Sequence, residues 1–146
     1  MNPGNGPDDA AGSAGPPEAV GRETVLVPRN AASARDTVTR LLASRPAGHR
    51  LAEVVVADAL LVTSELVTNA FRHGGGLTGF TAELTDEGLL LAVADASPHA
   101  PVTSAHSPRT AHVGGYGWPL VCRLAERVSI TFHPGGKRIV ALIALS

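Results

Sequence analysis

The chain has 146 residues, of which 44% are hydrophobic and 17% are charged, so it can bury one sizeable core without disulfides. Its 12 Lys and Arg residues nearly balance 13 Asp and Glu residues, and the net charge of −1 argues against binding to nucleic acid or to a membrane surface. One cysteine, Cys122, excludes an internal disulfide, and the lack of a signal-peptide pattern or a run of about 18 apolar residues predicts a cytoplasmic protein.

Residues 1–21 differ in composition from the rest of the chain. They are almost all Gly, Pro, Ala, Asn, Ser and acidic residues, and Val20 is the only large apolar residue after Met1. Such a segment cannot bury enough apolar surface to fold by itself. We therefore predict a disordered tail, followed by one domain over residues 22–146.

A short strand and two helices are predicted next. The strand covers residues 23–28 and is closed by Pro28, which favours an edge position. Asn30 is a suitable N-cap for a helix whose apolar residues recur at helical spacing until the break at residues 46–48. A longer and more apolar helix is predicted over residues 51–73, and the glycines at 74–76 end it.

The second half of the chain predicts most of a sheet. Strands over residues 78–85 and 89–95 are joined by a turn and predict an antiparallel hairpin. Residues 96–117 lack apolar periodicity and form a long connection, which we interpret as a lid. A helix over 118–127 and strands over 128–132 and 138–145 complete the chain. The order predicts an α+β two-layer sandwich with helices on one face of a largely antiparallel sheet.

A polar stripe interrupts the apolar helix. Its members fall within one narrow sector at 100° per residue: Asp58, Glu65, Asn69 and Arg72, with His73 at the margin. Glu65 and Asn69 both offer oxygen ligands to Mg²⁺, and Glu65 can also orient or deprotonate an attacking hydroxyl. The opposite face carries residues that can pack on the sheet: Leu66, Val67, Ala70 and Phe71. The stripe is either the wall of a site or a solvated helix face.

Two further segments favour the first interpretation. Asp95 ends an apolar strand, where its carboxylate can accept a hydrogen bond from an exocyclic amine, although an Asx turn would use the same residue. Gly114, Gly115 and Gly117 directly precede a helix, where backbone N–H groups can approach phosphate oxygens. No segment matches the P-loop or the dinucleotide-binding glycine pattern, so those two sites are excluded.

Together, these segments resemble a known family. Residues 65–74, 95–98 and 115–121 resemble, in order and spacing, the asparagine box and the two glycine boxes of the GHKL (Bergerat-fold) ATP-binding superfamily. The resemblance covers roughly residues 23–145, and within the superfamily the chain looks like the short anti-sigma-factor serine/threonine kinases of bacterial partner-switching systems. It implies a mostly antiparallel mixed sheet with helices on one face and an ATP lid.

The resemblance also implies roles for individual residues. Asn69 would hold the Mg²⁺ that bridges the triphosphate, and Asp95 would bind the adenine amine. Glu65 would be the general base or the residue that orients the attacking hydroxyl. The other implied cofactor-binding residues are Ser97 beside Asp95, Gly115 and Gly117 at the phosphates, and Arg72 and His73 near the phosphate end. Arg138 stands where relatives often place a threonine that helps to hold the base.

Two functions remain open from the sequence. The first is a protein kinase that uses Mg·ATP to phosphorylate an anti-sigma-factor antagonist and sequesters a sigma factor. The second is a non-catalytic module that binds a sigma factor or another partner, with or without nucleotide. Glu65 favours the kinase because a pure binding module needs no base there, whereas Arg138 favours the module. No direct contact with nucleic acid or membrane is expected, and a homodimer is compatible with the resemblance.

Overall fold

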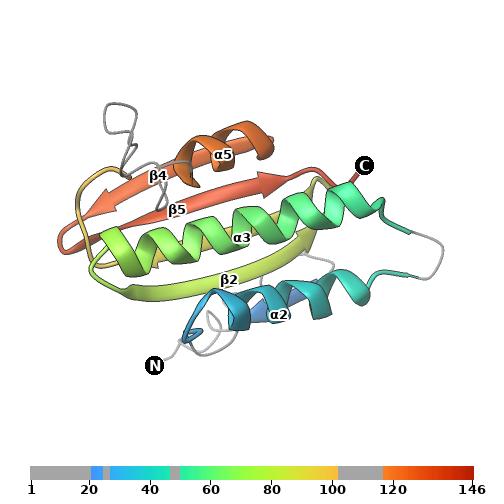
Figure 1. The fold of residues 1–146 in the computed structure, drawn as a ribbon, viewed down its shortest axis with the longest axis horizontal. Helices are drawn as coiled ribbons and strands as arrows, with labels where there is room; N and C mark the ends of the chain where they lie inside the picture. The colour runs from blue at the N-terminus through green and yellow to red at the C-terminus, as the bar shows by residue number, and fades with distance from the viewer. Residues whose placement is uncertain (1–20, 25–26, 47–49, 102–116) are drawn as a thin grey trace, which may run out of the picture.

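The computed structural model describes residues 21–24, 27–46, 50–101 and 117–146. It consists of two layers, with three helices covering one face of a five-stranded sheet (Figure 1). The helices are α2 (Ala31–Ala43), α3 (Glu53–His73) and α5 (Gly117–Leu124), and the strands are β1 (Gly21–Thr24), β2 (Leu77–Thr85), β3 (Gly88–Asp95), β4 (Arg127–His133) and β5 (Gly136–Ile143). The predicted α+β sandwich is confirmed.

The sheet has the order β1-β2-β3-β5-β4, and all four pairings in the described part of the chain are antiparallel. The mixed sheet implied by the resemblance is therefore not found among these strands. The hairpin of β2 and β3 and the edge position of β1 are as predicted, although β1 begins at Gly21 and ends at Thr24. Gly21, predicted as the end of the tail, belongs to β1, and the rest of the predicted tail lies outside the described residues. Of the predicted lid over residues 96–117, residues 102–116 also lie outside them.

Helix α2 begins where its cap predicts. Asn30 has an extended backbone, and its side-chain oxygen accepts a hydrogen bond from the backbone N–H of Ser33 at 2.9 Å. This bond satisfies one of the donors that the first turn of a helix leaves without partners. The helix then buries one apolar face against the sheet and α3: Ala34, Val38, Leu41 and Leu42.

Loss of this cap gives a direct test of the helix start. We expect Asn30→Ala to lower the free energy of unfolding by about 1 kcal/mol, because alanine cannot accept the Ser33 bond. Urea denaturation followed by circular dichroism measures the change. Asn30→Asp, which keeps a cap acceptor, should stay close to the wild-type value, and equal loss in both variants would contradict the assignment.

Helix α3 is the central element of the helical layer. It lies across β2 and β3, between α2 and α5 (Figure 1). Its buried residues are Ala59, Val62, Thr63, Leu66, Val67 and Ala70, whereas Phe71, which the sequence places on the packing face, is 44% exposed. By length and composition alone α3 could cross a membrane, a test that the buried core helix of a globular domain also passes.

Helix α5 is shorter than predicted and ends at Leu124. The chain turns there, and Arg127, expected in the helix, instead begins β4, where its guanidinium lies 2.9 Å from Glu87 Oε1. Cys122 is on the exposed side of this helix. Partial desolvation raises the pKa of the Cys122 thiol, which disfavours the reactive thiolate.

Candidate functional site

Three of the predicted residues come together at the contact between α3 and α5. Glu65 and Asn69 are one helical turn apart on α3, so they lie on the same face. Gly117, the first residue of α5, is buried directly against them. A Cβ atom at Gly117 would collide with Glu65 Oε1 and lie 3.5 Å from Asn69 Oδ1. Glycine is therefore the residue that allows α5 to begin against this carboxylate and amide.

The amide of Asn69 is incompletely satisfied. Its Nδ2 atom is buried, yet it has no hydrogen-bond partner among the described residues. A buried donor without an acceptor is costly, and native proteins usually pair such groups. An acceptor-rich ligand, such as a phosphate, would supply the missing partner.

Arg72 and His73 mark the open end of α3. Both side chains are exposed, and both lie in the last turn of the helix, three and four residues after Asn69. Cations are favoured at this end by the helix dipole, independently of any ligand. The structure therefore places them in the helix turn that follows Asn69, where the helix dipole favours their positive charge.

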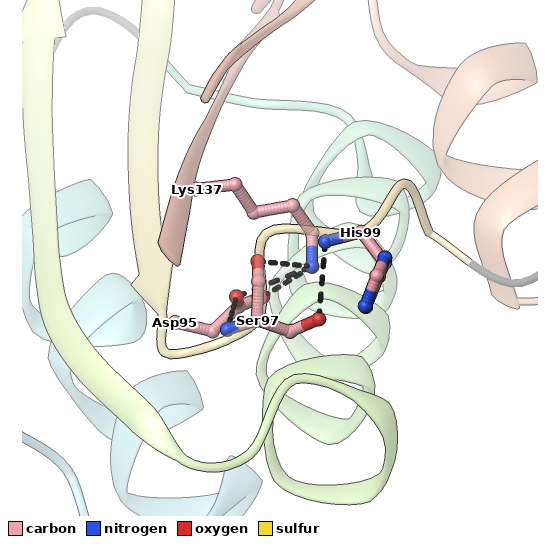
Figure 2. Close-up of polar contacts among 4 residues, drawn as sticks. All are labelled: Asp95, Ser97, His99 and Lys137. Carbon is pink, nitrogen blue, oxygen red and sulfur yellow. Dashed lines mark hydrogen bonds and ion pairs between the residues drawn. The ribbon is translucent and has the colours of Figure 1, made fainter. Parts of the chain in front are cut away.

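Asp95 forms a second group, at the end of β3. Its carboxylate is 4% exposed and accepts the backbone N–H of Ser97 at 2.9 Å, so the Asx turn considered from the sequence is present. The Lys137 ammonium lies 2.9 Å from Asp95 Oδ2 and 3.2 Å from Oδ1, and 3.5 Å from the carbonyl oxygen of Ser97 (Figure 2). Lys137 is itself 4% exposed, so this is a buried ion pair.

Two glycines pack against Asp95 at positions where a side chain would collide with it. A Cβ at Gly74, after the end of α3, would lie 2.6 Å from the Asp95 Oδ2 atom. A Cβ at Gly136, the first residue of β5, would collide with the Asp95 backbone oxygen. The backbone N–H of Ala96 also donates to the carbonyl of Gly74 at 2.8 Å. The ends of α3 and β3 and the start of β5 therefore meet at this carboxylate.

The strand register shows which residue of β5 lies beside Asp95. Lys137 is the direct cross-strand partner of Asp95, whereas Arg138 pairs with Ala94. Because successive residues of a strand point to opposite faces, Arg138 is exposed on the face away from Asp95. The structure thus separates Arg138 from the predicted base-binding residues and brings in Lys137, which the sequence analysis missed. The signal in the sequence that could have found Lys137 is Asp95 at the end of an apolar strand, because a carboxylate that is buried there needs a cationic partner.

The two groups lie at one end of the molecule. Asn69 and Gly74 are five residues apart, which corresponds to about 7 Å along a helix axis. The first group offers an amide and a carboxylate beside a helix N-terminus, and the second offers a buried carboxylate with an ammonium. Such a pair of sites suits a ligand with phosphates at one end and a polar base at the other. Gly115 lies outside the described residues.

Comparison with known families agrees with this geometry. The family model of the histidine kinase-like ATPase domain matches residues 26–143. The chain belongs to this family. The match covers the three described helices and the strands from β2 to β5. It indicates that the chain is an ATP-binding ATPase domain. A search of curated proteins found no match.

The residues present fit a nucleotide with a magnesium ion. The described part of this histidine kinase-like ATPase domain holds no cluster of three or more His, Cys, Asp or Glu residues that could bind a metal alone. Mg²⁺ is commonly held by one or two protein oxygens together with substrate phosphates. Asn69 Oδ1, next to Gly117, could supply such an oxygen.

Proposed function

We propose that this ATPase domain is a protein kinase that transfers the γ-phosphoryl group of ATP to a serine or threonine hydroxyl of a partner protein. The observation that carries the proposal is the position of Glu65, one turn before Asn69 and against the first residue of α5. A domain that only binds nucleotide needs phosphate and base contacts, but it has no use for a carboxylate at the phosphate end.

In this proposal each residue has a separate role. Asn69 would hold Mg²⁺, which neutralises charge on the triphosphate. Glu65 accepts the proton of the attacking serine or threonine hydroxyl. The oxygen of that hydroxyl forms a bond to the γ-phosphorus while the bond from the γ-phosphorus to the bridging oxygen of ADP breaks. The α5 N-terminus, beginning at Gly117, faces the phosphates with its partial positive charge. Asp95 binds the exocyclic amine of adenine.

The partners belong to the same proposal. The resemblance to anti-sigma-factor kinases implies an antagonist protein that receives the phosphoryl group and a sigma factor that the kinase sequesters. This fits a small domain in which α2, α3 and α5 cover one face of the sheet and leave the other face without a helical layer in the described part of the chain (Figure 1).

A non-catalytic module is the second candidate, and one observation favours it. The carboxylate expected to bind the adenine amine already contacts Lys137 and the backbone N–H of Ser97, and it is almost fully buried. If this pair excludes the base, nucleotide binding is lost and regulation would rest on protein binding alone.

Calorimetric titration with ATP tests the nucleotide site on which the kinase proposal depends. We expect saturable binding that requires Mg²⁺ and is abolished in Asn69→Ala, because the substitution removes the amide that contacts both metal and phosphate in the proposal. Thr68→Ala, which also truncates a polar side chain to alanine but one residue earlier, is the control and should bind like the wild type. Absence of binding by the wild type at millimolar ATP would favour the module, and normal Mg·ATP binding by Asn69→Ala would refute the site.

A further inference from the structure

Lys137 has hydrogen-bonding capacity that the ion pair leaves unused. An ammonium carries three N–H donors. The two oxygens of one carboxylate subtend a much smaller angle at Nζ than the tetrahedral angle between two N–H bonds, so one N–H serves both Asp95 oxygens. A second points to the Ser97 carbonyl at 3.5 Å, beyond the usual range for a strong bond. The third N–H has no acceptor within hydrogen-bond distance in the described ranges.

Asp95 also retains an acceptor position. Its Oδ1 atom takes the Ser97 N–H and shares the ammonium, whereas Oδ2 receives only the ammonium within the described ranges. A carboxylate oxygen has two lone-pair sites, so Oδ2 can accept one more donor. Gly74 lies against this atom, and a Cβ at position 74 would come within 2.6 Å of Oδ2, so only glycine leaves this space unfilled. The pair therefore presents one donor beside one acceptor.

Both side chains are held in place by their surroundings. Lys137 and Asp95 are cross-strand partners on one face of the sheet, each 4% exposed. The turn from Asp95 to His99 is fixed by the Ser97 N–H bond and by the His99 N–H bond to Ser97 Oγ at 3.2 Å, and it wraps over the ammonium (Figure 2). A donor and acceptor fixed in this way discriminate strongly, since a ligand that fails to match leaves a buried polar group unpaired.

We propose that Lys137 is a specificity-determining residue of the base pocket: it donates a hydrogen bond to the ring nitrogen N1 of adenine while the neighbouring exocyclic amine donates to Asp95. This rests on the proposed nucleotide binding. Adenine places an amine donor next to a ring acceptor, which is the complement of the pair. Guanine in the same pose would turn a carbonyl oxygen toward Asp95 and an N–H toward Lys137, so it is rejected at both atoms.

The test compares ATP with 1-deaza-ATP, in which a C–H replaces N1 and the amine is kept. For the wild-type protein with Mg²⁺ we expect 1-deaza-ATP to bind roughly 10-fold to 100-fold more weakly than ATP, because a charge-assisted hydrogen bond is lost. Calorimetry measures both affinities without any acceptor protein. Equal affinities would overturn the proposal and leave the proposed function standing, whereas the absence of ATP binding would overturn both.

Variants then assign the effect to Lys137. Lys137→Met keeps the length of the side chain but removes the donors, so the preference for ATP over 1-deaza-ATP should fall to about one. Arg138→Met is the same type of substitution on the opposite face of β5, and it should leave the preference unchanged. Because Lys137→Met is expected to destabilise the fold, the comparison is made below its melting temperature and repeated in Asp95→Asn/Lys137→Met. A preference that survives in both Lys137 variants, or that disappears in Arg138→Met, would contradict the assignment.

Discussion

Glu65→Gln is expected to bind Mg·ATP with nearly wild-type affinity and to transfer its phosphoryl group roughly 10²-fold to 10⁴-fold more slowly. Glutamine has the shape of glutamate and fits against Gly117 in the same way, but it cannot accept the proton of the attacking hydroxyl. Label transfer from γ-labelled ATP to candidate antagonist proteins measures the rate, and calorimetry on the same preparations measures binding.

The control for this variant is Asp58→Asn. Asp58 belongs to the same polar stripe, but it lies about two helical turns before Glu65 and is not among the atoms nearest to Gly117. It should leave binding and transfer unchanged. If Glu65→Gln also transfers at the wild-type rate, Glu65 serves only to stabilise the start of α5. Its loss would then appear as a lower melting temperature, through a charge–dipole term of about 0.3–1 kcal/mol.

The fold could be predicted wherever short-range patterns determine the element. Asn30 and the glycines after His73 mark the ends of α2 and α3, and both ends were placed within two residues. The hairpin of β2 and β3 follows from two apolar runs around Asp86 and Glu87. Phe71 was misplaced because it lies at the edge of the apolar sector, where helical spacing alone does not decide between core and solvent.

The residue of β5 that faces the site could not be predicted, for an identifiable reason. A half-buried strand shows which face is which by alternating apolar and polar residues. From Ile139 to Ile143, β5 is apolar at every position, so its sequence contains no alternation. A shift of one residue exchanges the two faces, so the sequence does not decide between Lys137 and Arg138 as the neighbour of Asp95. The observed register places Lys137 there.

The group formed by Glu65, Asn69 and Gly117 could be predicted more completely from the sequence. Glu65 and Asn69 are on one helix, so their spacing alone brings them together. Their meeting with Gly117 is a long-range contact between α3 and α5, and there the order of the family motifs supplied what helical spacing could not. The Asn69 Nδ2 atom is buried without a hydrogen-bond partner among the described residues, which is a property of packing that only the structure reveals.

Lys137→Met should cost about 3–5 kcal/mol of unfolding free energy, because it leaves the Asp95 carboxylate buried at 4% exposure without its counter-ion. Urea denaturation at pH 7 measures the loss. In Asp95→Asn/Lys137→Met neither charge remains, and most of the stability should return, since neutral pairs often replace buried ion pairs at little cost.

This double variant separates stability from function. If the pair existed to hold β3 and β5 together, the double variant would be about as unstable as Lys137→Met. If stability returns while the affinity for ATP falls, the two charges contribute little to the fold as a pair, and nucleotide recognition accounts for their presence at the junction of α3, β3 and β5. A stable Lys137→Met protein would instead show that water or a neighbouring group replaces the ammonium, and that the carboxylate is less enclosed than its exposure indicates.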